Sequence, residues 1–158
     1  MIKETPKAGD ILLVRVPFIK KATFLHYLIG LAQKPVERYG EVMTYTHAAL
    51  FTGSGMQIIE AAAKGVQYGF AQADHRDNEL WRPVGLTEEQ RQVAVKAAAT
   101  KIGNVYGWLD LISGGHIRTK ADVCSEVVVG ALRTAGVDLG AAWAPNHLAR
   151  SPKLERIV

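Results

Sequence analysis

The sequence contains a single cysteine, Cys124, among its 158 residues. One cysteine excludes a disulfide bond within the chain and any metal cluster that is built on several cysteine ligands. Two roles remain for this side chain, a buried apolar filler or a reactive thiol. The filler is the default interpretation because unpaired cysteine is among the most buried residue types, so the surroundings of Cys124 must decide between the two.

Long apolar runs are also absent. No stretch approaches the roughly 20 residues that a membrane-spanning helix needs, so we expect no stable membrane insertion. Residues 1–7 lack the apolar segment of a secretory signal. We therefore expect a protein that is cytoplasmic as synthesised, and delivery to a cell wall would require phage lysis or a dedicated secretion route.

The charged fraction, 22%, is ordinary for a globular protein, and no long run of one sign is present. Nineteen Lys and Arg against fifteen Asp and Glu leave a net charge of +4, which favours an anionic partner without selecting one. The basic residues form no run longer than Lys20-Lys21 and are not interleaved with aromatic residues, so we expect no nucleic-acid binding. No His, Asp and Glu cluster has metal-ligand spacing, so we expect no metal and no cofactor. The oligomeric state stays open.

The hydrophobic pattern predicts one α+β domain over residues 1–158, with an antiparallel sheet packed on helices. The predicted strands are 11–16, 46–51, 56–61, 65–70 and 80–84, the last at an edge of the sheet because it contains proline. The predicted helices are 20–33, one that a capping-box pattern opens at Thr87 and that runs to about 102, and 122–134 with Gly136 as C-cap. We expect a loop over 35–44 and a non-regular surface tail over 144–158.

The strands 46–51 and 56–61 flank Gly53-Ser54, which is typical of a two-residue hairpin loop. This loop would place His47 directly opposite Glu60, at a distance where imidazole and carboxylate can hydrogen-bond. The carboxylate would fix the tautomer of the ring and leave the other ring nitrogen free to take a proton. An ion pair at the edge of a sheet shows the same pattern, and from the hairpin alone it is the simpler interpretation.

Cys124 lies two residues after Asp122, a candidate N-cap, and so falls in the first turn of a predicted helix. Backbone N–H groups and the helix dipole stabilise a thiolate there, and the same N–H groups can bind the oxyanion of an acyl-transfer intermediate. The negative charge of Asp122 would act in the opposite direction unless capping occupies its side chain. Cysteine, histidine and an orienting acceptor are the parts of a thiol hydrolase.

Several segments, taken in order, resemble the circularly permuted papain-like amidases of the YiiX/YaeF type. This group belongs to the NlpC-type cysteine hydrolase superfamily and is related to lecithin:retinol acyltransferase. The matching segments are 9–13 (GDILL), 45–55 (YTHAALFTGSG), 59–61 (IEA) with 65–66 (GV), 123–128 (VCSEVV) and 145–151 (PNHLARS). The resemblance implies a permuted papain-like fold in which the base precedes the nucleophile along the chain.

The resemblance also assigns roles to individual residues. Cys124 would be the nucleophile, at a helix N-terminus, with His47 as the base and Glu60 orienting His47. A tyrosine lines the oxyanion site in NlpC-type relatives, and Tyr106 is the candidate here. Trp143, beside the proline of the 145–151 segment, is the candidate aromatic residue for lining a cleft.

These roles predict a hydrolase that cleaves an amide bond through an acyl-enzyme, with a peptide of the cell-wall type as substrate. A lipid-directed thioesterase, phospholipase or acyltransferase is the alternative, since the amphipathic segment 20–33 and the positive charge suit an acyl-lipid substrate. A binding module that has kept the fold without turnover is a third possibility. The complete Cys124, His47 and Glu60 set argues against the third.

Overall fold

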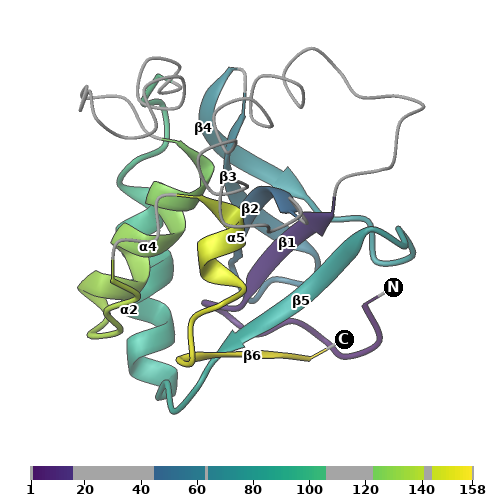
Figure 1. Ribbon diagram of the computed structural model, residues 1–158. Coiled ribbons are helices and arrows are strands. Elements are labelled where there is room, and N and C mark those ends of the chain that lie inside the picture. The colour runs from purple at the N-terminus through teal and green to yellow at the C-terminus, as the bar shows by residue number, and fades with distance from the viewer. Residues whose placement is uncertain (1, 16–44, 63, 106–122, 141–143, 158) are drawn as a thin grey trace, which may run out of the picture.

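The computed structural model describes residues 2–15, 45–62, 64–105, 123–140 and 144–157, and within them the architecture is α+β (Figure 1). Six strands form one antiparallel sheet in the order β4-β3-β2-β1-β5-β6. The strands are β1 (Ile11–Arg15), β2 (Tyr45–Phe51), β3 (Gln57–Ala62), β4 (Gly65–Phe70), β5 (Asn78–Pro83) and β6 (Leu154–Arg156). The helices are α2 (Glu88–Ala99), α4 (Cys124–Thr134) and α5 (Pro145–Leu148). The α+β class and the antiparallel sheet predicted from the sequence are confirmed.

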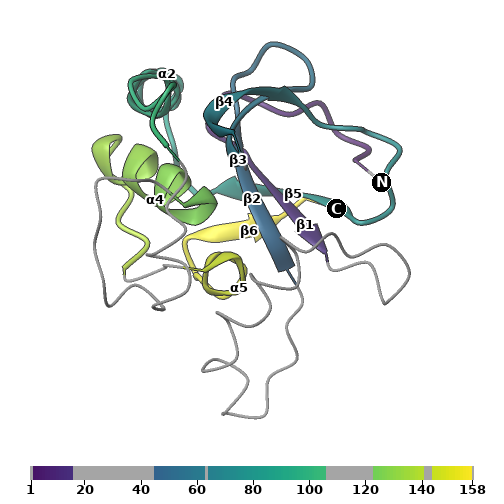
Figure 2. The same cartoon turned by 90° about the horizontal axis from the view of Figure 1, so that it is seen from above.

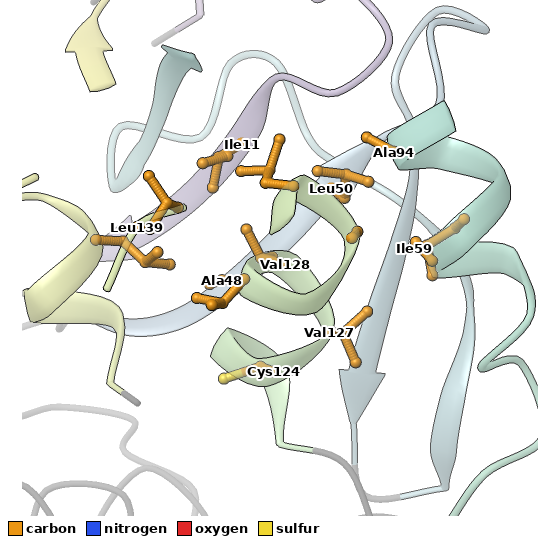
Figure 3. Close-up of a cluster of buried hydrophobic side chains, with 14 of the residues drawn as sticks. Ile11, Ala48, Leu50, Ile59, Ala94, Cys124, Val127, Val128 and Leu139 are labelled. Atoms are coloured by element: carbon orange, nitrogen blue, oxygen red, sulfur yellow. The ribbon is translucent and has the colours of Figure 1, made fainter. Parts of the chain in front are cut away.

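Helices α2 and α4 lie side by side on one face of the sheet, as the view from above shows (Figure 2). The interface is dry and apolar: Leu50 and Ile59 from the strands meet Val127 and Val128 from α4, and each of the four is at most 1% exposed. Figure 3 shows this cluster, with Cys124 at one end of it in the first turn of α4. The core therefore fixes where the N-terminus of α4 meets the sheet.

The opposite face of the sheet carries a second, smaller apolar cluster. Leu12, Ala49 and Phe51 alternate along β1 and β2 with the residues that face the helices, as the period of two in a strand requires. Ile58 and Leu80 extend the cluster onto the neighbouring strands. Both faces of the central strands are thus buried, which explains their nearly continuous apolar sequence.

The buried carboxylate of Asp10 joins the start of β1 to two distant elements. Its side chain is fully buried and accepts hydrogen bonds from Arg91 of α2, at 2.9 Å, and from Arg82 of β5, at 2.7 Å. The guanidinium groups supply the charge and the donors that a buried carboxylate requires. The Gly9-Asp10 turn signal in the sequence therefore marks a structural junction.

The start of α2 and the end of α4 are the ones that the sequence predicts. Thr87 and Gln90 form a reciprocal capping box at the start of α2, although this helix ends at Ala99, before residue 102. After α4, Gly136 adopts a φ of 90°, and the N–H of Val137 donates to the carbonyl of Leu132 at 2.9 Å. This is the Schellman arrangement, in which glycine occupies the left-handed position.

Two predictions about the C-terminal part of the chain are wrong. The tail 144–158 is not a non-regular surface segment, because α5 packs against β2 with Leu148 fully buried, and β6 pairs with β5. For the same reason β5 is not an edge strand. Pro83 is tolerated because it lies at the last position of β5, opposite Leu154.

The predicted helix 20–33 and the predicted loop 35–44 lie outside the described residues. Among the residues that the structure does describe, no helix has both the length and the apolar character to cross a membrane.

Candidate active site

The hairpin of β2 and β3 carries His47 and Glu60, but its register differs from the predicted one. Ala49, not His47, lies directly opposite Glu60. The reason is the loop: the N–H of Thr52 donates to the carbonyl of Gln57 at 3.0 Å, so the loop spans 53–56 and is longer than Gly53-Ser54. The shift is two residues, an even number, and therefore leaves His47 and Glu60 on the same face of the sheet.

The two side chains meet across the diagonal of the ladder. His47 Nε2 lies 2.8 Å from Glu60 Oε2, and both side chains are 20% exposed. Diagonal neighbours on adjacent strands are within reach of long side chains, which is why the contact survives the change in register. The contact engages Nε2, so Nδ1 is the ring nitrogen that remains for a second partner.

Cys124 is the first residue of α4 and is buried, with 3% of its surface exposed. The N-cap of α4 is Val123 and not Asp122 as predicted, and Asp122 lies outside the described residues. The backbone N–H of Val123 donates to the carboxylate of Glu126 at 3.3 Å, which is half of a capping box. The position in the first helical turn is confirmed, and the positive end of the helix dipole acts on the sulfur there.

The sulfur of Cys124 and the ring of His47 meet where β2 and β3 separate. Pairing between these strands ends at Ala49 and Glu60, although β3 continues to pair with β4 as far as Ala62. Alternate N–H groups of β2 point toward β3, so the N–H of Ala48 is turned to the side that β3 has left. It donates to the Cys124 sulfur instead. The end of the ladder thus provides a donor for the thiolate.

The electrostatics of the pair favour charge separation. Burial by itself raises the pKa of the Cys124 thiol, but the hydrogen bond and the positive charge of His47 lower it below its ordinary value. Backbone N–H groups of Ala48 and Ser125 act in the same direction. Burial likewise lowers the pKa of His47, whereas the interactions with Cys124 and Glu60 raise it to about 10. The arrangement therefore stabilises a thiolate beside an imidazolium.

Glu60 is the negative partner on the far side of the ring. Its hydrogen bond to His47 lowers the pKa of the carboxyl group, against the opposite effect of burial. An ionised carboxylate on Nε2 fixes the ring orientation and directs Nδ1 to the sulfur. The geometry is that of a cysteine, histidine and carboxylate triad.

The start of β2 is anchored by groups that the sequence pattern did not identify. The backbone N–H of Tyr45 donates to Asn146 Oδ1 of α5 at 2.9 Å, and the Tyr45 hydroxyl donates to the buried carboxylate of Glu79 at 2.7 Å. A bulge at Thr46 interrupts the pairing with β1 immediately before His47. No local signal marks these contacts, because each joins segments that are far apart in the sequence.

The candidate oxyanion and cleft residues, Tyr106 and Trp143, lie outside the described residues. The exposed loop residue His75 contacts Asp77 and not the site. In the described part of the chain no group of three or more His, Cys, Asp or Glu side chains could hold a metal ion.

In comparisons with known proteins, no family model matches the sequence, and no curated protein or solved structure matches it either.

Proposed function

We propose that the protein is a cysteine hydrolase of the permuted papain-like kind, with Cys124 as nucleophile and His47 as the proton carrier that Glu60 orients. The observation that carries the proposal is the contact of one imidazole with both a carboxylate and a first-turn cysteine. The chain order, histidine before cysteine, and the resemblance of the segments around both residues support the permuted form. A non-catalytic binding module does not explain why the thiol pKa is lowered in a buried position.

The proposed reaction begins from the thiolate–imidazolium pair. The Cys124 sulfur attacks the carbonyl carbon of an amide, and the carbonyl π electrons move to oxygen to form an oxyanion beside the first-turn N–H groups of α4. Collapse of this tetrahedral species breaks the C–N bond. The amine leaves with the proton of the His47 imidazolium, and an acyl thioester remains on Cys124.

Hydrolysis of the thioester restores the starting state. Neutral His47 takes a proton from a water molecule, whose oxygen attacks the thioester carbonyl. Collapse releases the carboxylic acid product and the Cys124 thiolate, while the proton stays on His47. Glu60 keeps the ring in one orientation through both half-reactions and stabilises its positive charge.

For the substrate, we propose a peptide amide of the cell-wall type in preference to an acyl lipid. The preference follows from the resemblance to the NlpC-type superfamily. The lipid-directed alternative rests on the segment 20–33, which lies outside the described residues, and on the net charge of +4.

Alkylation of the single cysteine tests the proposal directly, since no other thiol contributes to the signal. We expect native Cys124 to react with iodoacetamide at pH 7 faster than a free thiol of ordinary pKa, because more of it is thiolate. The variant His47→Ala should lose this advantage, while the matched control His75→Ala, at an exposed loop histidine, should keep it. A native thiol no faster than the thiol of the urea-unfolded chain would contradict the proposal.

The substrate class is tested by trapping the acyl-enzyme. After incubation with either a peptidoglycan stem peptide or a dispersed phospholipid, mass spectrometry should find an acyl group on Cys124 from the peptide, and none in Cys124→Ser. Turnover of the lipid ester, with peptidoglycan left uncleaved, would support the proposal of a cysteine hydrolase but would replace the peptide by the lipid as its substrate.

A further inference from the structure

Three adjacent strands place polar or small residues in a row beside the site. His47 of β2 contacts Glu60 of β3, and Glu60 lies directly opposite Gln67 of β4. Gly69 of β4 is opposite Ile58, so it shares the face that carries Glu60 and Gln67. This row continues from the imidazole toward the edge strand, and the hydrolase mechanism uses only His47 and Glu60 of it.

Gly69 is a glycine that the backbone conformation does not require. The glycines with positive φ are elsewhere, and in a strand glycine costs stability because it packs no side chain. The reason for glycine is the carboxylate above it: a Cβ at this position would lie 2.6 Å from Glu60 Oε1 and 3.2 Å from Glu60 Cδ. The carboxylate therefore occupies the space that any other side chain at position 69 would fill.

Gln67 holds the same carboxylate from the side. Its side chain hydrogen-bonds to Glu60, and this bond helps to keep the pKa of the Glu60 carboxyl group low. Direct opposition across the β3–β4 ladder puts the two side chains within the distance that such a bond requires. With His47 on one side, Gln67 on another and the Gly69 backbone beneath, the carboxylate has one orientation.

We propose that Gln67 and Gly69 are positioning residues that together form the seat of Glu60, and through it set the charge state of His47 and Cys124. The inference rests on the proposed function. The carboxylate stabilises the imidazolium only if its oxygen stays near His47 Nε2. Glu60 has a long, partly exposed side chain, and Gln67 and Gly69 restrict it to the rotamer that keeps the oxygen there. Neither residue touches the sulfur or the reacting carbonyl in the proposed reaction.

The variant Gly69→Ala tests the seat. The new methyl group should displace the carboxylate from His47, so the thiol pKa rises, and the pH at which alkylation begins to fall should move upward, with a loss of about tenfold per pH unit below it. Gly130→Ala is the matched control, because a Cβ at Gly130 meets nothing within 4 Å. It should leave the pH profile of alkylation unchanged.

A double variant separates positioning from a general disturbance of the sheet. In a Glu60→Ala background the space above Gly69 is empty, so adding Gly69→Ala should produce no further change in alkylation at any pH. If Gly69→Ala lowers the alkylation rate equally in the wild-type and Glu60→Ala proteins, the methyl group disturbs β4 itself and not the Glu60 carboxylate. This result would overturn the proposal.

Gln67 is tested by variants that keep its size. Gln67→Leu removes the donor and should shift the alkylation profile in the same direction as Gly69→Ala, by a smaller amount because Gly69 still leaves room for the carboxylate. Gln67→Glu adds a negative charge beside Glu60 and should raise the pKa of that carboxyl group. Gln72→Leu, at an exposed loop position, is the control.

The outcomes for the seat and for the hydrolase are distinguishable. A native protein whose Cys124 is no more reactive than an ordinary thiol refutes the proposed function. A reactive native thiol with unchanged profiles in Gly69→Ala and Gln67→Leu refutes the seat alone.

Discussion

His47 takes part in two interactions whose effects on its ring reinforce each other. Glu60 holds Nε2 at 2.8 Å, and the thiolate of Cys124 is the second anionic partner. Each partner raises the pKa of the imidazole, and the protonated ring in turn lowers the pKa of both partners. The three charges are therefore a single unit, and removal of any one should change the titration of the other two.

The alkylation rate of Cys124 should depend only weakly on pH around neutrality. The folded-state pKa of the thiol is lowered, so the thiolate persists as the pH falls through the ordinary thiol range and is lost only at the lower folded-state pKa. In the unfolded chain the thiol titrates near 8.5, and its rate should rise about tenfold per pH unit below that value. Iodoacetamide kinetics between pH 5 and pH 9, with and without urea, measure both profiles.

The variant Glu60→Gln provides the comparison for this profile. An amide can still accept the ring N–H but carries no charge, so the native profile should shift partway toward the unfolded one. A pH profile identical to that of wild type would mean that the charge of Glu60 does not influence the pKa of the Cys124 thiol.

At this scale the sequence predicted the partners but not their register. Side chains alternate along a strand, so an error of two residues in the hairpin left His47 and Glu60 on one face. The N–H of Ala48 could not be predicted, because its availability depends on where the β2–β3 ladder ends. The N-cap was predicted one residue early, since Asp122 has the better capping side chain but Val123 takes the position.

Among the elements, α4 is defined at both ends by contacts of its backbone. Its first turn presents Cys124 to the sheet, and its last turn is closed by Gly136, with the N–H of Gly136 donating to Arg133 at 3.0 Å. The apolar side chains between these ends pack on β2 and β3. The position of Cys124 thus depends on the docking of the whole helix.

Replacing Gly136 by alanine should destabilise the fold by about 1–2 kcal/mol, because a residue with a Cβ is strained at a φ of 90°. Urea unfolding should show a lower midpoint with an unchanged slope. The control is Gly130→Ala in the middle of α4, where the higher helix propensity of alanine should stabilise the fold by up to about 1 kcal/mol. A Gly136→Ala midpoint equal to that of wild type would contradict the assigned helix end.

The sequence predicted the long elements well and missed the short ones. The capping box identified the start of α2 and Gly136 identified the end of α4, because these signals are local. Helix α5 and strand β6 are too short for any hydrophobic period to develop, so the tail was assigned no regular structure. The resulting error also gave β5 the wrong place in the sheet.

At the scale of the whole molecule, the C-terminal segment contacts the two strands that flank β1, which are β2 and β5. Helix α5 packs against β2, and β6 pairs with β5. The order of the strands in the sheet departs from their order in the chain where β5 pairs with β1. Such long-range pairings depend on the complete fold and leave no local trace in the sequence. The α+β class could be predicted, whereas this closing contact could not.

The variant Leu148→Ala measures how much the C-terminal segment contributes to the free energy of unfolding. Leu148 is fully buried and belongs to the main core, so the change should cost about 2–5 kcal/mol through lost burial and the cavity that remains. Thermal and urea unfolding followed by circular dichroism give this value. Glu155→Ala, at an exposed position of the same segment, is the control and should stay within about 0.5 kcal/mol of wild type.

The approach of α4 to the open end of the β2–β3 ladder has a consequence for the protein during its synthesis. The hairpin with His47 and Glu60 leaves the ribosome well before Cys124. The backbone N–H of Ala48, which donates to the Cys124 sulfur in the folded protein, belongs to β2 of this hairpin. Until α4 docks, the Cys124 thiol lacks these partners and should have the pKa of an ordinary thiol. The proposed nucleophile acquires its partners on β2 only when α4 docks on the sheet, so its reactivity depends on completed folding.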